Sequence, residues 1–146
     1  MQDVYNAWSK ASELERWFLK KASHSNQEKK PIPQNEPLQT GYFYSWSWFL
    51  SEPVENGKVL QANGTNHFQF TFAGDCIVDV KLSEKLEYTQ VELHMYNIPV
   101  DELSKEEIRL NCQSGWAFYL VNLKSIYEGG IDLRNKDERF NPMVNN

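Results

Sequence analysis

The side chains that most often carry out chemistry are few and widely separated in this sequence. Its three histidines are His24, His67 and His94, and no two of them have the spacing that places both on one metal ion. The two cysteines, Cys76 and Cys112, also lack a metal-ligand spacing, and no glycine-rich phosphate loop is present. The sequence therefore predicts no bound metal ion and no cofactor.

Cys112 is the nucleophile whose position would favour activation. It lies near the start of a predicted helix, where a thiolate is stabilised, but no histidine lies nearby to act as its base. We therefore interpret both cysteines as reduced, buried thiols and assign no catalytic residue. Four carboxylates in polar surroundings are interpreted as solvated charges: Glu13, Glu15, Glu106 and Glu107.

Charge and hydropathy narrow the classes of partner. The net charge is −5 and no arginine-rich stripe occurs, which argues against a nucleic-acid binder. No apolar run is long enough to span a membrane, and the N-terminus lacks the basic start and apolar middle of a signal peptide. We therefore predict a cytoplasmic protein. The lysine pairs at 20–21 and 29–30 favour solubility, with docking of an acidic partner as the alternative.

Aromatic residues give the strongest structural signal, because they alternate with other side chains. Residues 41–49 are predicted as a strand with Tyr42, Tyr44, Trp46 and Trp48 on one face. Residues 68–72 repeat this pattern with three phenylalanines. Further strands are predicted at 58–62, 76–82 and 88–96, joined by turns at 51–57, 63–64, 73–75 and 83–87. Because these connections are short, neighbouring strands should pair antiparallel.

Two helical regions flank the strands. Residues 115–128 are predicted as one long helix, because Trp116, Leu120, Leu123 and Tyr127 fall on one face. Asn111 or Ser114 could cap its start, and the glycines at 129–130 could end it. Residues 4–22 are predicted as a bent pair of short helices. Residues 23–40 contain three prolines and are predicted as a loop without helix or strand.

The apolar face of such a sheet needs a cover, and the long helix is the element of sufficient length. We therefore predict an α+β fold, in which a curved antiparallel sheet wraps round a long C-terminal helix and the two short helices plug one end. Residues 1–133 should form a single domain, followed by a flexible tail at 134–146.

Four segments, in order along the chain, carry a resemblance to a known superfamily. They are VYNAW and LERWF within 4–18, the glycine and alternating aromatics at 41–48, GKVL and FQFTF within 57–72, and Gly115-Trp116 with Leu120, Leu123 and Glu128. The chain resembles the START-like (SRPBCC) superfamily and, within it, domains similar to the activator of the heat-shock-protein-90 ATPase. This resemblance implies the helix-grip fold and an internal cavity that often holds an apolar ligand, but no single activity.

One departure from the family concerns the edge of the sheet. Family members normally open with an edge strand, whereas only residues 1–3 precede the first helix here. The sheet would then have an uncovered edge along 88–96. A second copy in a homodimer or the tail could fill that edge, or the sheet could be shortened.

The aromatic face is the candidate ligand-binding site. Tyr44 and the indole N–H groups of Trp46 and Trp48 would supply polar tips in an apolar pocket, and Gln61 is expected to share the inward face with Val59. The rings could fill the core and leave a small pocket, or leave a cavity that holds a ligand. The predicted ligand-binding residues are Tyr44, Trp46, Trp48, Gln61, Phe68, Phe70, Val80, Leu93, Met95, Trp116, Leu120, Leu123 and Tyr127.

Three functions are compatible with these predictions. We favour binding of a small apolar or amphipathic ligand. The first alternative, which the resemblance suggests, is docking on a chaperone of the heat-shock-protein-90 type to stimulate its ATPase. The second is an enzyme of the cyclase or hydrolase type, which would need a polar dyad inside the cavity, where the predicted inward faces offer few ionisable groups.

Overall fold

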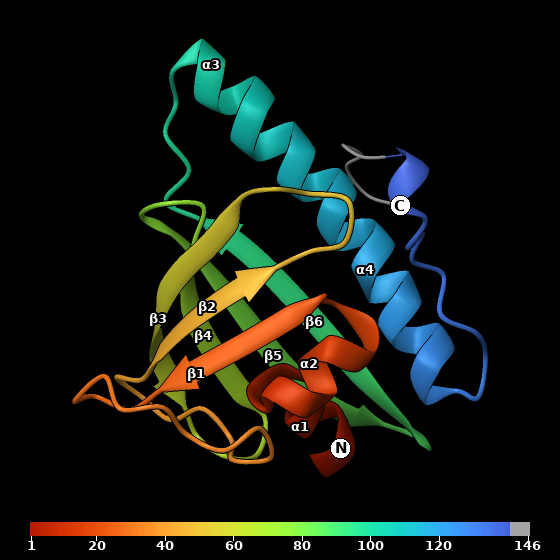
Figure 1. Ribbon diagram of the computed structural model, residues 1–146. Helices are drawn as coiled ribbons and strands as arrows, with labels where there is room; N and C mark the ends of the chain where they lie inside the picture. The colour runs from red at the N-terminus through yellow and green to blue at the C-terminus, as the bar shows by residue number, and fades with distance from the viewer. Residues whose placement is uncertain (141–146) are drawn as a thin grey trace.

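The chain forms a six-stranded antiparallel sheet whose inner face is covered by two short N-terminal helices and one long C-terminal helix (Figure 1). The computed structural model describes residues 1–140. The strands follow one another in the order β1-β2-β3-β4-β5-β6, each paired antiparallel with the next. The predicted α+β fold and meander are confirmed. The predicted tail reaches to residue 146, and its last part, 141–146, lies outside the described residues.

The N-terminal helices form a bent pair, as expected. Helix α1 spans Gln2–Ser9 and α2 spans Ala11–Trp17, separated by Lys10, whose extended backbone breaks the helix. The helices bury Trp8 and Trp17 against each other, with ring centroids 4.8 Å apart. Both helices lie on the inner face of the sheet (Figure 1). The pair is therefore part of the core as well as a plug at one end.

Strand β1, Lys21–Ser25, takes the end of the predicted helical region 4–22 and the start of the predicted loop 23–40, so both predictions are wrong there. Ala22 and His24 are buried and alternate with exposed neighbours, which is the pattern of a half-buried strand. β1 pairs with β2, Phe43–Ser47, with Ala22 opposite Trp46. Lys20 and Lys21 at the start of the strand and the prolines after it concealed this short alternation.

Strand β3, Val54–Ala62, begins inside the predicted turn 51–57, so that prediction is wrong from Val54 onward. Gly57 belongs to this strand because the Tyr44 ring lies across it. A Cβ atom at Gly57 would lie 2.3 Å from the Tyr44 hydroxyl oxygen, which no side chain tolerates. The glycine that indicated a turn therefore marks a close approach between neighbouring strands.

A β-bulge in β3 changes which side chains face inward. Val59 pairs with Phe70, but Gln61 pairs with Gln69 on the outer face, because the register shifts between Val59 and Gln61. Gln61 is exposed, so the prediction that it shares the inward face with Val59 is wrong. Ala62 takes the inward position instead, opposite Phe68.

The remaining strands complete the sheet at its open side. β4 spans His67–Phe72, β5 spans Cys76–Lys85 and β6 spans Tyr88–Tyr96. The predicted turn 83–87 is shorter than expected, because β5 continues to Lys85. Within residues 1–140, β6 pairs with β5 alone. The outer edge of β6 is therefore uncovered by these residues, as the sequence predicted.

The long helix begins earlier than predicted. It runs without a break for 26 residues through α3 (Glu102–Ser104), the π-helical segment η1 (Lys105–Leu110) and α4 (Asn111–Tyr127). Asp101 caps its start by accepting a hydrogen bond from the Ser104 amide at 2.9 Å, so the predicted caps at Asn111 and Ser114 are wrong. Gly129, at φ +82°, follows the helix as expected.

The start of the long helix projects past the sheet (Figure 1). No residue of α3 or η1 is buried, whereas α4 buries Trp116, Tyr119, Asn122 and Leu123. Within residues 1–140, no helix combines the length and apolar character needed to span a membrane.

After α4 the chain folds back onto α2. Arg134 is buried and donates hydrogen bonds to the carbonyl oxygens of Leu19, Glu15 and Arg16 at 2.7 to 3.0 Å. Asn122, also buried, donates to the Trp17 carbonyl oxygen at 2.6 Å. A guanidinium at the last carbonyls of a helix satisfies acceptors that the helix leaves unpaired. The segment after α4 thus connects the two helical regions.

Candidate functional site

The inner face of the sheet is a continuous aromatic surface. Tyr44, Trp46, Phe68 and Phe70 are at most 3 % exposed. Tyr44 and Trp46 stack with ring centroids 3.7 Å apart, and Trp46 meets Phe70 edge-on at 5.3 Å. These four predicted site residues lie together, as their alternation in the sequence indicated.

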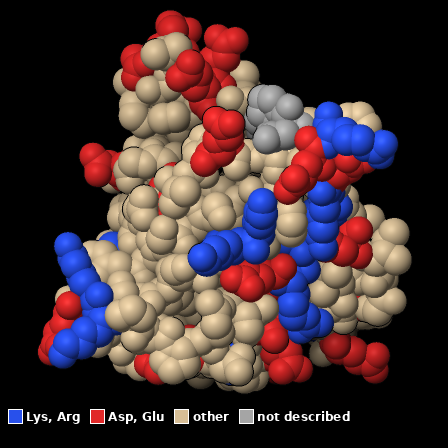
Figure 2. All heavy atoms as spheres, viewed as in Figure 1, with Lys and Arg blue, Asp and Glu red and all other residues tan. Residues whose placement is uncertain are grey.

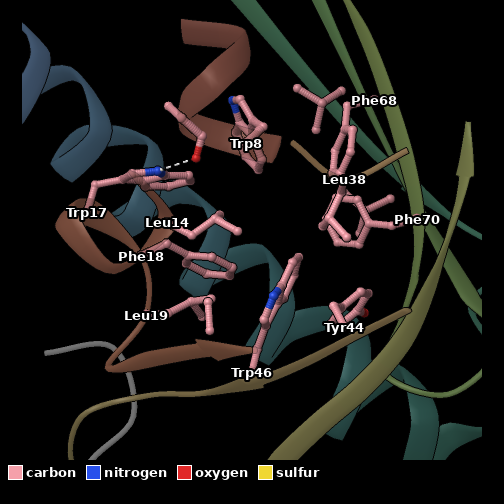
Figure 3. Packing of buried hydrophobic residues seen from close by; sticks show 14 of the residues in the cluster. Trp8, Leu14, Trp17, Phe18, Leu19, Leu38, Tyr44, Trp46, Phe68 and Phe70 are labelled. Carbon is pink, nitrogen blue, oxygen red and sulfur yellow. Dashed lines mark hydrogen bonds between the residues drawn. The ribbon is translucent and has the colours of Figure 1, made fainter. Parts of the chain in front are cut away.

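The helices supply the opposite wall of this core. Figure 3 shows Trp8 of α1 and Phe18, which directly follows α2, across the core from the rings of the sheet. From α4, Trp116 packs with centroid distances of 5.1 Å to Phe18 and 5.2 Å to Phe72. Trp8 and Phe18 were absent from the predicted site, because the sequence alone assigned the covering role to the long helix.

The other predicted site residues differ in their burial. Val80 and Leu123 are buried, while Trp48, Leu93, Met95 and Leu120 are partly buried against the core. Tyr127 lies near α2, where its hydroxyl donates a 2.5 Å hydrogen bond to Glu13. Burial and the Glu13 carboxylate raise the pKa of Tyr127. Tyr127 therefore connects α4 with α2. The candidate pocket consists of the other predicted residues that face the core.

Two indole groups in this core have no hydrogen-bond partner. The Nε1 atoms of Trp8 and Trp116 are buried, and no described residue accepts from them. Trp17, by contrast, donates to the Ala7 carbonyl oxygen at 2.9 Å (Figure 3), and Trp46 donates to His24 Nε2 at 3.2 Å. The ring centroids of Trp8 and Trp116, whose N–H groups lack an acceptor, are 6.1 Å apart. Each buried unpaired donor costs about 1–3 kcal/mol.

His24 is a buried polar group on the same face. Because its Nε2 accepts from Trp46, the neutral ring carries its proton on Nδ1, which has no partner among the described residues. Burial lowers the pKa of His24 to about 4. His24 is therefore uncharged at neutral pH. The sequence predicted a loop at this position and indicated no role for His24.

Glu55 is a functional candidate that sequence analysis missed. It lies on β3 opposite Trp46, and its Oε1 accepts a 3.0 Å hydrogen bond from the Ala73 amide. The side chain is partly buried, and desolvation raises its pKa. No Lys, Arg or His of residues 1–140 forms an ion pair with it. The alternation of Glu55, Gly57 and Val59 could have indicated a strand with these residues on its inner face. Pro53 and Gly57 instead favoured the prediction of a turn.

The two thiols near this carboxyl are not ionised. Cys76 is fully buried on β5 opposite Phe72, and Cys112 is partly buried on α4. Burial raises the pKa of both thiols, to about 11 for Cys112, and neither forms a disulfide. A raised pKa is the opposite of what a nucleophilic cysteine requires.

The sheet, the helix across its inner face and the two short N-terminal helices define a class of protein: the helix-grip, or START-like (SRPBCC), fold. The chain belongs to the family described as "Activator of Hsp90 ATPase homolog 1-like protein", whose profile matches residues 1–128. This confirms the resemblance on which the sequence analysis relied.

Two solved structures share this fold. A crystal structure of a Staphylococcus saprophyticus protein has a TM-score of 0.71 at 16% identity, covering 91% of this chain and 87% of the other. A solution structure of the Aha1 dimer from Colwellia psychrerythraea has a TM-score of 0.65 at 15% identity, covering 88% of each chain. No curated protein sequence matches the chain.

Proposed function

We propose that this protein binds a small apolar or amphipathic ligand between the inner face of its sheet and α4. The observation that carries the proposal is the pair of buried indole N–H groups on Trp8 and Trp116, which have no acceptor among the described residues. Apolar pockets with a few polar groups are the usual form of small-molecule sites. A ligand with a hydroxyl or carbonyl oxygen would satisfy these donors.

The side chains at the rim of this core support the same proposal. Val91, Leu93 and Met95 of β6 face inward but stay only partly buried, as do Trp48 and Phe72. Where β6 meets the start of the long helix, a pocket of about 230 Å³ is lined by apolar residues such as Met95 and Pro99 together with Lys105 and Arg109. A bound chain of methylene groups would remove this apolar surface from water.

The Trp116→Phe substitution tests the proposal, because it keeps an aromatic ring and removes one unpaired N–H. The probe is 1-dodecanol, followed by native mass spectrometry and by displacement titration. We expect one molecule bound per chain, and an affinity reduced roughly fivefold to tenfold in the variant. Trp17→Phe is the matched control: its N–H already has an acceptor, so its dodecanol affinity should not change.

Two results would count against the proposal or a part of it. Failure of the unmodified protein to bind 1-dodecanol would end it. Equal affinity in Trp116→Phe and in the unmodified protein would remove the role of the indole donors. Trp17→Phe should melt at a lower temperature than Trp116→Phe, because only the former loses a satisfied hydrogen bond.

The family description supports a second candidate function, stimulation of a chaperone ATPase of the heat-shock-protein-90 type. This candidate is tested by adding the purified chain to the chaperone and measuring ATP hydrolysis. An unchanged rate over a range of molar ratios would rule it out. Dodecanol binding in the same preparation would then separate the two candidates.

We further propose that two copies of the chain pair through the open edge of β6. Such an edge offers unpaired backbone groups to a second strand. A two-fold axis through Leu93 would place Glu92 of one copy opposite His94 of the other, whereas an axis through Glu92 would oppose like charges. The structurally similar Colwellia protein is itself a dimer. A monomeric mass at every concentration would rule out this pairing.

A further inference from the structure

We propose that Glu55 selects ligands with a cationic amine end, and this inference rests on the proposed ligand-binding function. An amphipathic amine would place its ammonium group at the Glu55 carboxylate and its hydrocarbon chain along the aromatic core. The proposal follows from three features of the rim: a partly buried carboxylate, the absence of a cation beside it and the aromatic rings around it.

The position of Glu55 is fixed by the sheet. It lies directly opposite Trp46 across the β2–β3 pair, and both side chains face inward. Its Oε1 accepts from the amide of Ala73, the residue that follows Phe72. The carboxylate therefore lies at the end of β4, at the backbone amide that follows Phe72, and the Phe72 ring in turn packs on Trp116 of α4.

The carboxylate lacks a compensating charge. Among residues 1–140, its only hydrogen bond is the one from Ala73, and no cationic side chain forms an ion pair with it. A partly desolvated carboxylate is unfavourable unless it is paired. The nearby groups that could titrate are Tyr44 of β2, Cys76 of β5 and Cys112 of α4, and none of them supplies a positive charge.

Aromatic rings next to a carboxylate are the chemical requirement for binding an organic cation. Phe72 lies 6.1 Å from Trp48 and 5.2 Å from Trp116, measured between ring centroids. Ring faces attract ammonium groups, by about 0.5–2 kcal/mol each depending on desolvation. Trp48 and Phe72 are only partly buried, so a ligand can reach this end of the core.

The charge around the rim favours the same ligand class. The helix start above the rim carries Asp101, Glu102, Glu106 and Glu107 against Lys105 and Arg109, and Figure 2 shows the acidic side chains gathered at that end. The net charge of −5 adds a weak attraction for cations over the whole surface.

The test compares 1-dodecylamine with 1-dodecanol, two ligands of equal chain length, both below their aggregation concentrations at pH 7.5. We expect the amine to bind at least tenfold more tightly than the alcohol. Glu55→Gln keeps an oxygen that can accept from Ala73 but removes the charge, so it should abolish the preference while leaving dodecanol affinity unchanged. Glu52→Gln, a nearby exposed glutamate, is the matched control and should keep the preference.

The outcomes separate this inference from the function on which it rests. Binding of neither ligand would overturn the proposed function itself. Equal binding of amine and alcohol, or an amine preference that survives Glu55→Gln, would overturn the role of Glu55 and leave ligand binding intact. If Glu55→Gln fails to fold, the unmodified protein still tests the inference. Equal affinities for dodecylamine and dodecanol would contradict it.

Discussion

At the scale of single residues, the aromatic core is unusual in the polar groups that it encloses. His24, Trp8 and Trp116 each bury a nitrogen without a partner among the described residues, and Glu55 places a carboxylate at the rim. A core of this kind costs stability wherever a polar group stays unpaired. We therefore connect these groups with ligand binding, and His24 with a measurable response to pH.

His24 should make the protein less stable in mild acid. Its folded-state pKa of about 4 lies below its ordinary value of 6.5, so the unfolded chain binds a proton in this interval that the folded chain does not. The stabilising difference is complete above pH 6.5 and is lost as the pH falls from 6.5 toward 4. Urea unfolding should show a loss of about 2 kcal/mol between pH 8 and pH 5.

A pair of variants isolates this effect. His24→Gln removes the titrating group and should flatten the dependence on pH between 8 and 5. His94→Gln removes an exposed histidine and should leave the dependence as it is in the unmodified protein. If both variants retain the full loss, other groups cause it and the role assigned to His24 is wrong.

At the scale of elements, connections that look irregular in the sequence hold the helices in place. The segment after α4 returns to α2 through the buried Arg134, which pairs with Asp132 at 2.7 Å and also binds three carbonyl oxygens. Desolvation acts to raise the pKa of Asp132, but hydrogen bonds from Arg134 and Lys136 hold it well below its usual range. This contact keeps α4 aligned with the N-terminal helices that face the core.

Loss of the Arg134 contact should destabilise the protein strongly. Arg134→Ala leaves the carbonyl oxygens of Glu15, Arg16 and Leu19 without this donor, and each buried unpaired acceptor typically costs about 1–3 kcal/mol. Asp132 keeps its ion pair with Lys136 at 2.8 Å. Arg139→Ala is the matched control, since Arg139 also pairs with an aspartate two residues before it but is 84% exposed, against 4% for Arg134. Chemical denaturation of Arg139→Ala should show a loss of less than about 1 kcal/mol. Similar losses in both variants would contradict the anchoring role.

At the scale of the whole molecule, the covering of the sheet is uneven. The N-terminal helices and α4 bury inward side chains of β2 to β5, whereas no other described strand pairs with the outer edge of β6 and the helix start projects past the sheet (Figure 1). The exposed side chains at this side include Tyr88, Val100 and Leu103. Both the ligand proposal and the pairing of two copies concern this open side.

Pairing through β6 predicts a mass that depends on concentration. Light scattering after gel filtration should approach twice the 17.1 kDa of the chain as concentration rises. His94→Glu would place two acidic groups opposite each other in both pairs beside the proposed two-fold axis and should lower the dimer fraction severalfold. Gln39→Glu adds the same charge in an exposed loop and should not. An effect of equal size in both variants would point to general charge repulsion.

Local periodicity in the sequence determined the class of fold, the strand faces and the aromatic core. Alternation over 41–49 and 68–72 and helical spacing over 115–128 are properties of neighbouring residues. They can therefore be recognised without any knowledge of tertiary contacts. Tertiary structure alone decided the positions of Glu55, Gln61 and Arg134. The packing of Tyr44 on Gly57 makes a strand of an expected turn, the bulge turns Gln61 outward, and the carbonyl groups of α2 bury Arg134. Each outcome depends on a partner distant in sequence, and for that reason no local pattern could contain it.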